Sequence, residues 1–280
     1  MSNRKIKTII NSTQTSDGAG VHLKRMFAYH EAKLMDPFLM LDDFSNDNLQ
    51  NYIKGFPWHP HRGIETITYM LKGSAEHGDS LGNTGIISGG DVQWMTSGSG
   101  IIHQEMPIPD HEGKMYGFQL WVNLPAGQKM CKPRYQNISQ KQIPIVNHHN
   151  GTTVKVICGT YNNVSGPVTE IAINPQFLDV NLPSKTEFEL ETIPGFTCFI
   201  YAYDGEGLID NKSITKNQVV LFEDGDKIHI KAHDNDFRFI YLTGKPLHEA
   251  IAWRGPIVMN TDAEINLAFD ELNSDTFIKK

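Results

Sequence analysis

Short apolar segments separated by glycine turns follow one another along the first half of the chain. They are rich in β-branched and aromatic residues, and turns such as Lys72-Gly73 and Gly89-Gly90-Asp91 come between them. Many short strands at intervals of about ten residues are typical of an all-β sandwich or barrel. We therefore expect strands at residues 65–71, 85–88, 92–96 and 116–124.

The second half of the chain repeats this pattern after a polar stretch. Residues 136–142 are mostly polar and form the candidate linker between two domains. The turn at residues 223–226 parallels Gly89-Gly90-Asp91, which hints at an internal duplication. The sequence thus predicts one domain at residues 1–135 and a second at residues 136–280. Strands of the second domain are expected at residues 154–157, 178–182, 198–202, 219–222, 227–231 and 238–242.

The clearest helical pattern lies near the end of the chain. Thr261 followed by Glu264 fits a capping box, in which each side chain satisfies a free backbone N–H of the first turn. Apolar residues then recur at the spacing of one helix face. We expect a helix over residues 261–272 that packs on a sheet through Ile265, Ala268, Phe269 and Leu272.

Composition and charge narrow the class of protein. The chain has 280 residues and a net charge of −7, which argues against a general affinity for DNA, RNA or anionic lipid. The three cysteines are far apart and form no C-x-x-C motif, so a disulfide framework is not expected. No signal peptide is evident, and no window approaches the roughly 18 apolar residues of a membrane helix. We expect a cytoplasmic protein.

Two residue pairs have the spacing that puts both side chains on one face of a strand. His59 and His61 form the first pair, and His103 and Glu105 form the second. Two neighbouring strands could therefore aim all four groups at one point and hold a metal. Imidazole with carboxylate suits Fe, Mn, Ni, Cu or Zn, and the lack of thiolates disfavours a structural zinc site. By the same alternation Glu65 faces the side of the first pair, so it is a rival to Glu105.

Longer stretches around these residues resemble the pirin family of the cupin superfamily. The matching stretches are residues 36–44, 56–66, 91–107, 119–125 and 255–261. The resemblance implies a bicupin fold, with two jelly-roll β-barrels in tandem and a metal in the N-terminal barrel alone. It also implies His59, His61, His103 and Glu105 as the metal ligands. On this basis Glu105 is favoured over Glu65, which becomes a structural group.

A cupin active site opens into the barrel interior, so residues on the inward faces of its strands would line a substrate pocket. Phe56, Met95, Gln119 and Trp121 are the candidates by alternation and position. Gln119 is notable because a buried amide needs hydrogen-bond partners. Arg62 points away from His61 on its strand and is expected to form a structural salt bridge.

The activity implied by the resemblance is that of a quercetin 2,3-dioxygenase, which opens a flavonol with O2. The cofactor would be Fe(II), although Mn, Ni, Co, Cu and Zn fit the same ligands. Glu105 would serve as the catalytic base as well as a ligand. The alternative implied by pirin relatives is an iron-dependent, redox-responsive binding partner of transcription or metabolic proteins. In either case we expect a monomer that contacts neither nucleic acid nor membrane directly.

Overall fold

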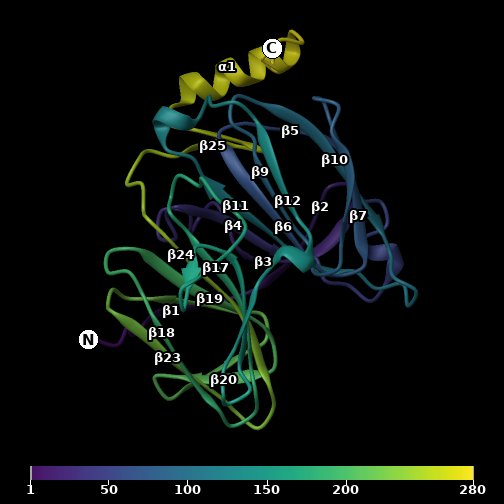
Figure 1. The fold of residues 1–280 in the computed structure, drawn as a ribbon. Coiled ribbons are helices and arrows are strands. Elements are labelled where there is room, and N and C mark those ends of the chain that lie inside the picture. Colours follow the sequence, from purple (N-terminus) through teal and green to yellow (C-terminus); the bar gives the residue numbers. More distant parts are fainter. Residues whose placement is uncertain (1, 280) are drawn as a thin grey trace. The chain divides into compact units, whose positions relative to one another are not determined.

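The computed structural model describes residues 2–279, which divide into two compact units. The N-terminal barrel comprises Thr13–Gln140 and the chain from Leu247 onward. The C-terminal barrel comprises the chain up to Ser12 and Lys141–Pro246. Antiparallel strands make up most of both units, so the prediction of an all-β fold is confirmed (Figure 1).

The elements of the N-terminal barrel are β2 (Thr13–Asp17), β3 (Val21–Phe27), β4 (Phe38–Asp43), η1 (Leu49–Asn51), β5 (Phe56–His61), β6 (Ile64–Lys72), β7 (Ser74–Asp79), β8 (Thr84–Ser88), β9 (Val92–Thr96), β10 (Ile101–Ile108), β11 (Tyr116–Asn123), η2 (Ala126–Gln128), β12 (Arg134–Ile138), β25 (Ala252–Arg254), β26 (Ile257–Met259) and α1 (Asp262–Asn273). Two sheets build the barrel. The larger has the order β12-β9-β6-β11-β4-β3-β2, and the smaller has the order β5-β10-β7-β8.

Strand β6 shows how the sequence produces the larger sheet. It is rich in β-branched and aromatic residues, and every residue from Ile64 to Met70 is buried. The strand pairs with β9 on one side and β11 on the other, so both of its edges are hydrogen-bonded. By alternation Thr66, Thr68 and Met70 share one face, and Thr68 and Met70 line the barrel cavity.

The elements of the C-terminal barrel are β1 (Ile6–Asn11), β13 (Ile145–Asn147), β14 (Thr153–Cys158), β15 (Thr160–Tyr161), β16 (Val164–Ser165), β17 (Gln176–Leu182), β18 (Glu187–Glu191), β19 (Thr197–Asp204), β20 (Glu206–Ile209), β21 (Lys212–Thr215), β22 (Gln218–Phe222), β23 (Lys227–Ala232) and β24 (Phe237–Gly244). Its sheets have the orders β1-β22-β19-β24-β17-β14-β13 and β18-β23-β20-β21. Both barrels therefore pair a seven-stranded with a four-stranded sheet, as an internal duplication would.

The two compact units divide the chain differently from the predicted domains at residues 1–135 and 136–280, because each terminal segment lies in the unit of the other half. The predicted ranges remain a proposal for the two domains. Strand β1 is hydrogen-bonded along β22 and so belongs to the C-terminal barrel. The segment with β25, β26 and α1 belongs to the N-terminal barrel. Pairing between residues some 200 apart leaves no local sequence signal, so a single boundary was the simplest expectation.

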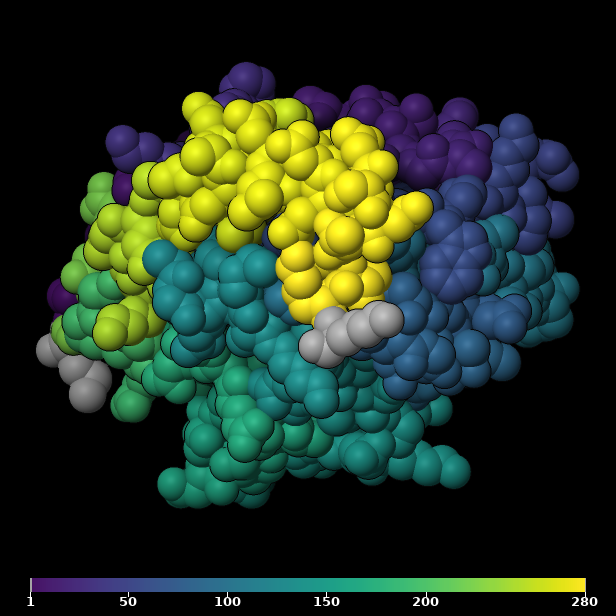
Figure 2. All heavy atoms as spheres, turned by 90° about the horizontal axis from the view of Figure 1, so that it is seen from above, coloured from purple at the N-terminus to yellow at the C-terminus, as the bar shows by residue number. Residues whose placement is uncertain are grey.

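Helix α1 begins and ends within one residue of the predicted range. Thr261 is its N-cap, and the capping box with Glu264 is present. Ile265 and Ala268 are buried against the ribbon β25-β26, with Phe269 and Leu272 partly buried beside them. Figure 2 shows this C-terminal segment, in yellow, as it covers part of the N-terminal barrel.

The predicted linker at residues 136–142 is wrong in its first part. Strand β12 extends to Ile138, which is buried and pairs with Val92. The 3-10 turn η3 (Gln140–Gln142) follows. The polar side chains at positions 136 and 137 belong to an edge strand of the sheet, where polar residues are tolerated.

No helix in the described part of the chain has the length and apolar character needed to span a membrane.

Candidate metal centre

Strands β5 and β10 bring the two predicted pairs together. They are antiparallel neighbours in the smaller sheet, and His103 lies directly opposite His59. Strand β5 is the edge strand of this sheet, which explains how it accommodates Pro57 and Pro60 without losing ladder hydrogen bonds. The residues His59, His61 and His103 thus reach one point from two adjacent strands, as predicted from their spacing.

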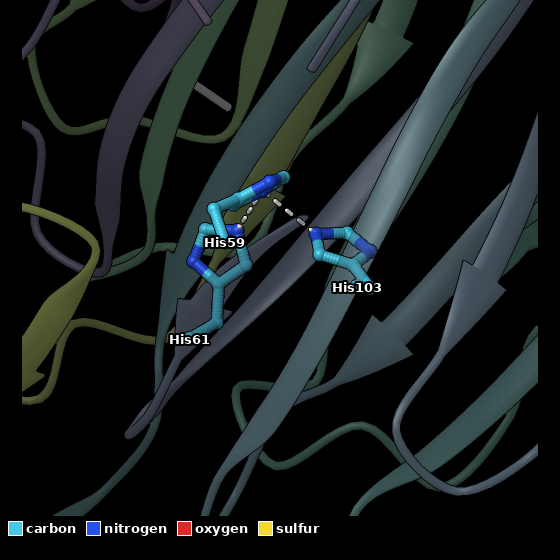
Figure 3. Close-up of side chains that lie close together, drawn as sticks. All are labelled: His59, His61 and His103. Carbon is cyan, nitrogen blue, oxygen red and sulfur yellow. Dashed lines mark hydrogen bonds between the residues drawn. The ribbon is translucent and has the colours of Figure 1, made fainter. Parts of the chain in front are cut away.

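The three imidazole rings converge through their Nε2 atoms (Figure 3). The Nε2 atom of His59 lies 3.0 Å from that of His61 and 2.9 Å from that of His103. For nitrogen ligands about 2.1 Å from a metal, a separation of about 3.0 Å corresponds to an angle near 90° at the metal. These two separations are those of ligands at right angles in an octahedral site, which would leave further positions open.

The second ring nitrogens of His59 and His61 decide which nitrogen carries the proton. Nδ1 of His59 is 2.8 Å from the carbonyl of Pro57, and Nδ1 of His61 is 3.2 Å from the carbonyl of Pro256. A carbonyl only accepts, so both Nδ1 atoms donate, and in the neutral rings both Nε2 atoms carry lone pairs. Two lone pairs facing each other at 3.0 Å are unfavourable unless a cation lies between them. The donor set therefore fits a divalent metal.

Burial favours the neutral form of the His61 and His103 imidazoles. It lowers the pKa of His61 well below its usual value, and the neighbouring His59 adds to this effect. Burial also lowers the pKa of His103 well below its usual value, with His61 and His59 contributing in the same direction. Both imidazoles are consequently neutral at neutral pH, which is the form that binds metals.

Glu105 lies beside the histidines but outside their cluster. The group of mutually close ligand atoms comprises the three histidines alone. The Glu105 side chain is buried, lines the same cavity and accepts a 3.0 Å hydrogen bond at Oε1 from the hydroxyl of Thr68. Burial raises the pKa of Glu105, and the nearby His59 and the bond from Thr68 oppose this shift. Its role as the fourth ligand remains a prediction.

The alternation of side chains that predicted Glu65 on the same face as the histidines is interrupted between His61 and Glu65. Strand β5 ends at His61, and Gly63, with a φ of +77°, turns the chain into β6 of the other sheet. A Cβ at this glycine would lie 2.0 Å from the carbonyl oxygen of Val258. Glu65 is buried, accepts a 2.7 Å hydrogen bond from Thr96 and has no place in the lining of the cavity.

A cavity of about 730 Å³ opens beside the histidines in the N-terminal barrel. Of the predicted pocket residues, Phe56, Gln119 and Trp121 line it. Met95 does not belong to the lining, because it is fully buried in β9 between Thr66 and Tyr135 of the neighbouring strands. Alternation alone does not reveal that this residue is fully buried outside the cavity lining.

An aromatic wall runs from the histidines along the cavity. The Trp121 ring meets His61 edge-on with 5.0 Å between centroids, and Trp253 lies 5.9 Å from Trp121. Tyr29 continues the wall at 5.7 Å from Trp253. Sequence reasoning missed Trp253 and Tyr29, as well as the Pro256 carbonyl, because each comes from a segment without strand alternation. The signals available were the tryptophan at position 253 and the resemblance of residues 255–261 to the pirin pattern.

Arg62 forms the predicted salt bridge and links the metal-site strand to the C-terminal segment. Its side chain is buried, and Nη2 lies 2.7 Å from Glu271 and donates a 2.9 Å hydrogen bond to the carbonyl of Phe277. Nε donates a 2.8 Å hydrogen bond to the carbonyl of Ser99, and the guanidinium lies 4.2 Å from the Phe277 ring centroid. A salt bridge, two hydrogen bonds and a cation–π contact therefore fix the position of Arg62, the residue that follows His61.

Replacing Arg62 with methionine is expected to lower the free energy of unfolding of the N-terminal barrel by about 3 kcal/mol, because buried carbonyls and Glu271 lose a charged partner. Urea unfolding followed by tryptophan fluorescence measures this change. Arg254→Met is the matched control, since Arg254 also contacts α1 but is exposed, packing 4.8 Å from the Phe269 ring centroid. Equal effects of both substitutions would contradict the assignment.

Two β-barrels in one chain, with the cluster of three histidines in the N-terminal barrel, define a cupin protein. This cluster is the single candidate metal centre among the described residues. The pirin family model matches residues 20–122, and the pirin C-terminal cupin domain model matches residues 177–278. The chain therefore belongs to the pirin family. The predicted fold of two cupin domains with a C-terminal helix is confirmed by these matches and by the solved structures similar to it.

Three similar proteins illustrate this membership. The pirin-like protein of Caulobacter vibrioides is 42% identical over 275 residues, which cover 98% of this chain and 99% of that protein. A crystal structure of quercetin 2,3-dioxygenase from Acinetobacter baumannii is 32% identical, covers 99% of both chains and has a TM-score of 0.90. The bacterial pirin YhhW from Escherichia coli, solved in complex with nickel(II), shares the fold at 19% identity and a TM-score of 0.69, over 85% of this chain and 99% of that chain.

Proposed function

We propose that this protein is a metal-dependent dioxygenase that opens the central ring of a flavonol such as quercetin with O2. The observation that carries the proposal is the convergence of three imidazoles beside an apolar cavity whose wall also holds the carboxylate of Glu105. The similarity to the Acinetobacter baumannii quercetin 2,3-dioxygenase supports it. The products would be the ring-opened ester and carbon monoxide.

The cavity suits a flat aromatic substrate. Its volume of about 730 Å³ falls within the range of about 300–1,000 Å³ that is typical of small-molecule sites. Trp121, Trp253 and Phe56 offer aromatic surfaces against which the rings of a flavonol would pack. A planar substrate held there would have one edge toward the histidines.

His59, His61 and His103 would hold the metal, which we propose to be Fe(II). Imidazole nitrogens suit iron, and Mn, Ni, Co, Cu and Zn compete for the same ligands. The nickel(II) of the Escherichia coli pirin supports a divalent ion. When bound, the metal would supply a Lewis acid and the reactivity with O2. The carbonyls of Pro57 and Pro256 would keep two of the rings oriented toward it.

Glu105 would act as the base that accepts the proton of the flavonol 3-hydroxyl. Its carboxylate lies in the cavity wall near His59, and burial raises its pKa toward the range in which a carboxylate accepts protons efficiently. The bond from Thr68 occupies Oε1, so the other oxygen is available to the substrate or the metal.

Protein loaded with Fe(II) is expected to consume quercetin only in the presence of O2. Loss of the flavonol absorbance under air, with release of carbon monoxide, measures the reaction. Identical protein under anaerobic conditions and metal-free protein under air are the controls. Unchanged flavonol absorbance despite full iron occupancy would remove this function.

A further inference from the structure

Thr68 connects Glu105 to a second polar side chain. Its hydroxyl lies 3.0 Å from Oε1 of Glu105, on the opposite sheet, and 2.7 Å from the amide of Gln119, on the neighbouring strand β11. Thr68 is buried and Gln119 half-buried, so few water molecules compete for these contacts. Hydrogen bonds thus connect Gln119 through Thr68 to Glu105, the proposed base.

The Thr68 hydroxyl can hold both partners at once. It has one proton to donate and lone pairs that accept, so it donates to one partner and accepts from the other. The Gln119 amide carries an acceptor oxygen and a donor N–H, and a 180° rotation of the amide exchanges them. Both contacts, at 3.0 and 2.7 Å, can therefore be hydrogen bonds at the same time.

Thr68 and Gln119 belong to a polar row that crosses the inner face of the larger sheet. Neighbouring strands pair its members directly, and the row consists of Asn137, Gln93, Thr68, Gln119, Asp42 and Arg25. Gln93 donates a 2.9 Å hydrogen bond to Asn137, and Arg25 binds Asp42 through bonds of 2.8 and 2.7 Å. The adjacent row is mostly apolar, with Met95, Thr66, Trp121 and Met40.

Burying such a row is unfavourable unless its members are hydrogen-bonded to one another. Thr68 is hydrogen-bonded both to Gln119 and to Glu105, so the side chains at the centre of the row are restrained in position. A restrained donor holds its acceptor in one orientation, and here that acceptor is the carboxylate in the cavity wall.

We infer that Thr68 and Gln119 are positioning residues that fix the carboxylate of Glu105 toward the three histidines. Gln119 acts through Thr68 and needs no contact with the substrate for this role. The inference deepens the proposed function and rests on it for the role of Glu105 as a base, but the orientation of the carboxylate can be measured independently.

The test compares Thr68→Val, which keeps the shape of the side chain, with Thr68→Ser, which keeps the hydroxyl. Thr68→Val is expected to lower kcat for quercetin about tenfold to a hundredfold, the effect of losing a hydrogen bond to a charged group, with KM changed about twofold at most. Thr68→Ser should restore most of kcat. In Co(II)-substituted protein, Thr68→Val should alter the visible ligand-field spectrum while the metal stays bound.

Thr96→Val is the matched control, because Thr96 makes the same kind of buried bond to Glu65, outside the cavity. It should leave the Co(II) spectrum unchanged. Gln119→Leu combined with Thr68→Val should be no worse than Thr68→Val alone, since Gln119 acts through Thr68.

A wild-type Co(II) spectrum and kcat in Thr68→Val would overturn the inference, as would a Thr68→Ser variant as impaired as Thr68→Val. If the wild-type protein itself leaves quercetin unchanged, the proposed function fails. The Co(II) spectra of the three threonine variants still decide the positioning role in that case.

Discussion

Replacing His61 with alanine is expected to weaken metal binding by at least about a hundredfold. Loss of a group that only supports a metal ligand typically costs about 10–100-fold in affinity, and His61 would be a ligand itself. Its removal also takes away the lone pair that faces His59 at 3.0 Å. Oxygen-dependent consumption of quercetin should fall in parallel with the metal content.

Metal content after dialysis against a chelator of known affinity measures this effect. His77→Ala is the matched control, because His77 is equally buried on the same sheet but lies outside the three-histidine cluster. Circular dichroism establishes that both variants are folded. A His61→Ala variant that retains stoichiometric metal would refute the assignment, and so would equal metal loss in both variants.

Replacing Glu105 with glutamine should lower kcat for quercetin by about a hundredfold to ten-thousandfold, the usual contribution of a general base. Glutamine has nearly the same shape and still accepts the bond from Thr68, but it cannot take the proton of the substrate. If Glu105 is also a ligand, iron occupancy will fall as well, so kcat is referred to the iron bound.

Glu65→Gln is the control for this prediction. Glu65 is a buried carboxylate bonded to a threonine, as Glu105 is, but it lies outside the cavity. Its substitution should change kcat by about threefold at most. A Glu105→Gln variant with the turnover of the wild type per iron, or a Glu65→Gln variant with the larger loss, would transfer the role of base away from Glu105.

Local sequence signals were sufficient for the terminal helix and for the ten strands predicted by range, out of 26 strands in the described residues. The strand predicted at residues 92–96 coincides with β9, and the Thr261–Glu264 capping box marks the start of α1. Both signals depend on interactions within one strand or one turn. The spacing of His59 and His61 also sufficed for their convergence, since alternation within an unbroken strand is a local property.

Contacts between residues on opposite sheets of the barrel could not be predicted from the sequence. Alternation counted onward from His61 placed Glu65 on the histidine face, but the turn at Gly63 starts a new strand in another sheet. Thr68 was not singled out, because nothing in its own strand shows that Glu105 of the opposite sheet lies within hydrogen-bond distance. Met95 was placed in the pocket, although it is fully buried and outside the cavity lining.

The sequence by itself determined the all-β class, the terminal helix and the two strands that carry the histidines, because periodicity and capping act over a few residues. The tertiary structure alone decided which carboxylate lies in the cavity, which segments form its aromatic wall and which carbonyls orient the imidazoles. Those features join residues up to 224 positions apart, as Tyr29 and Trp253 are, and such contacts arise only when the sheets close around a common interior.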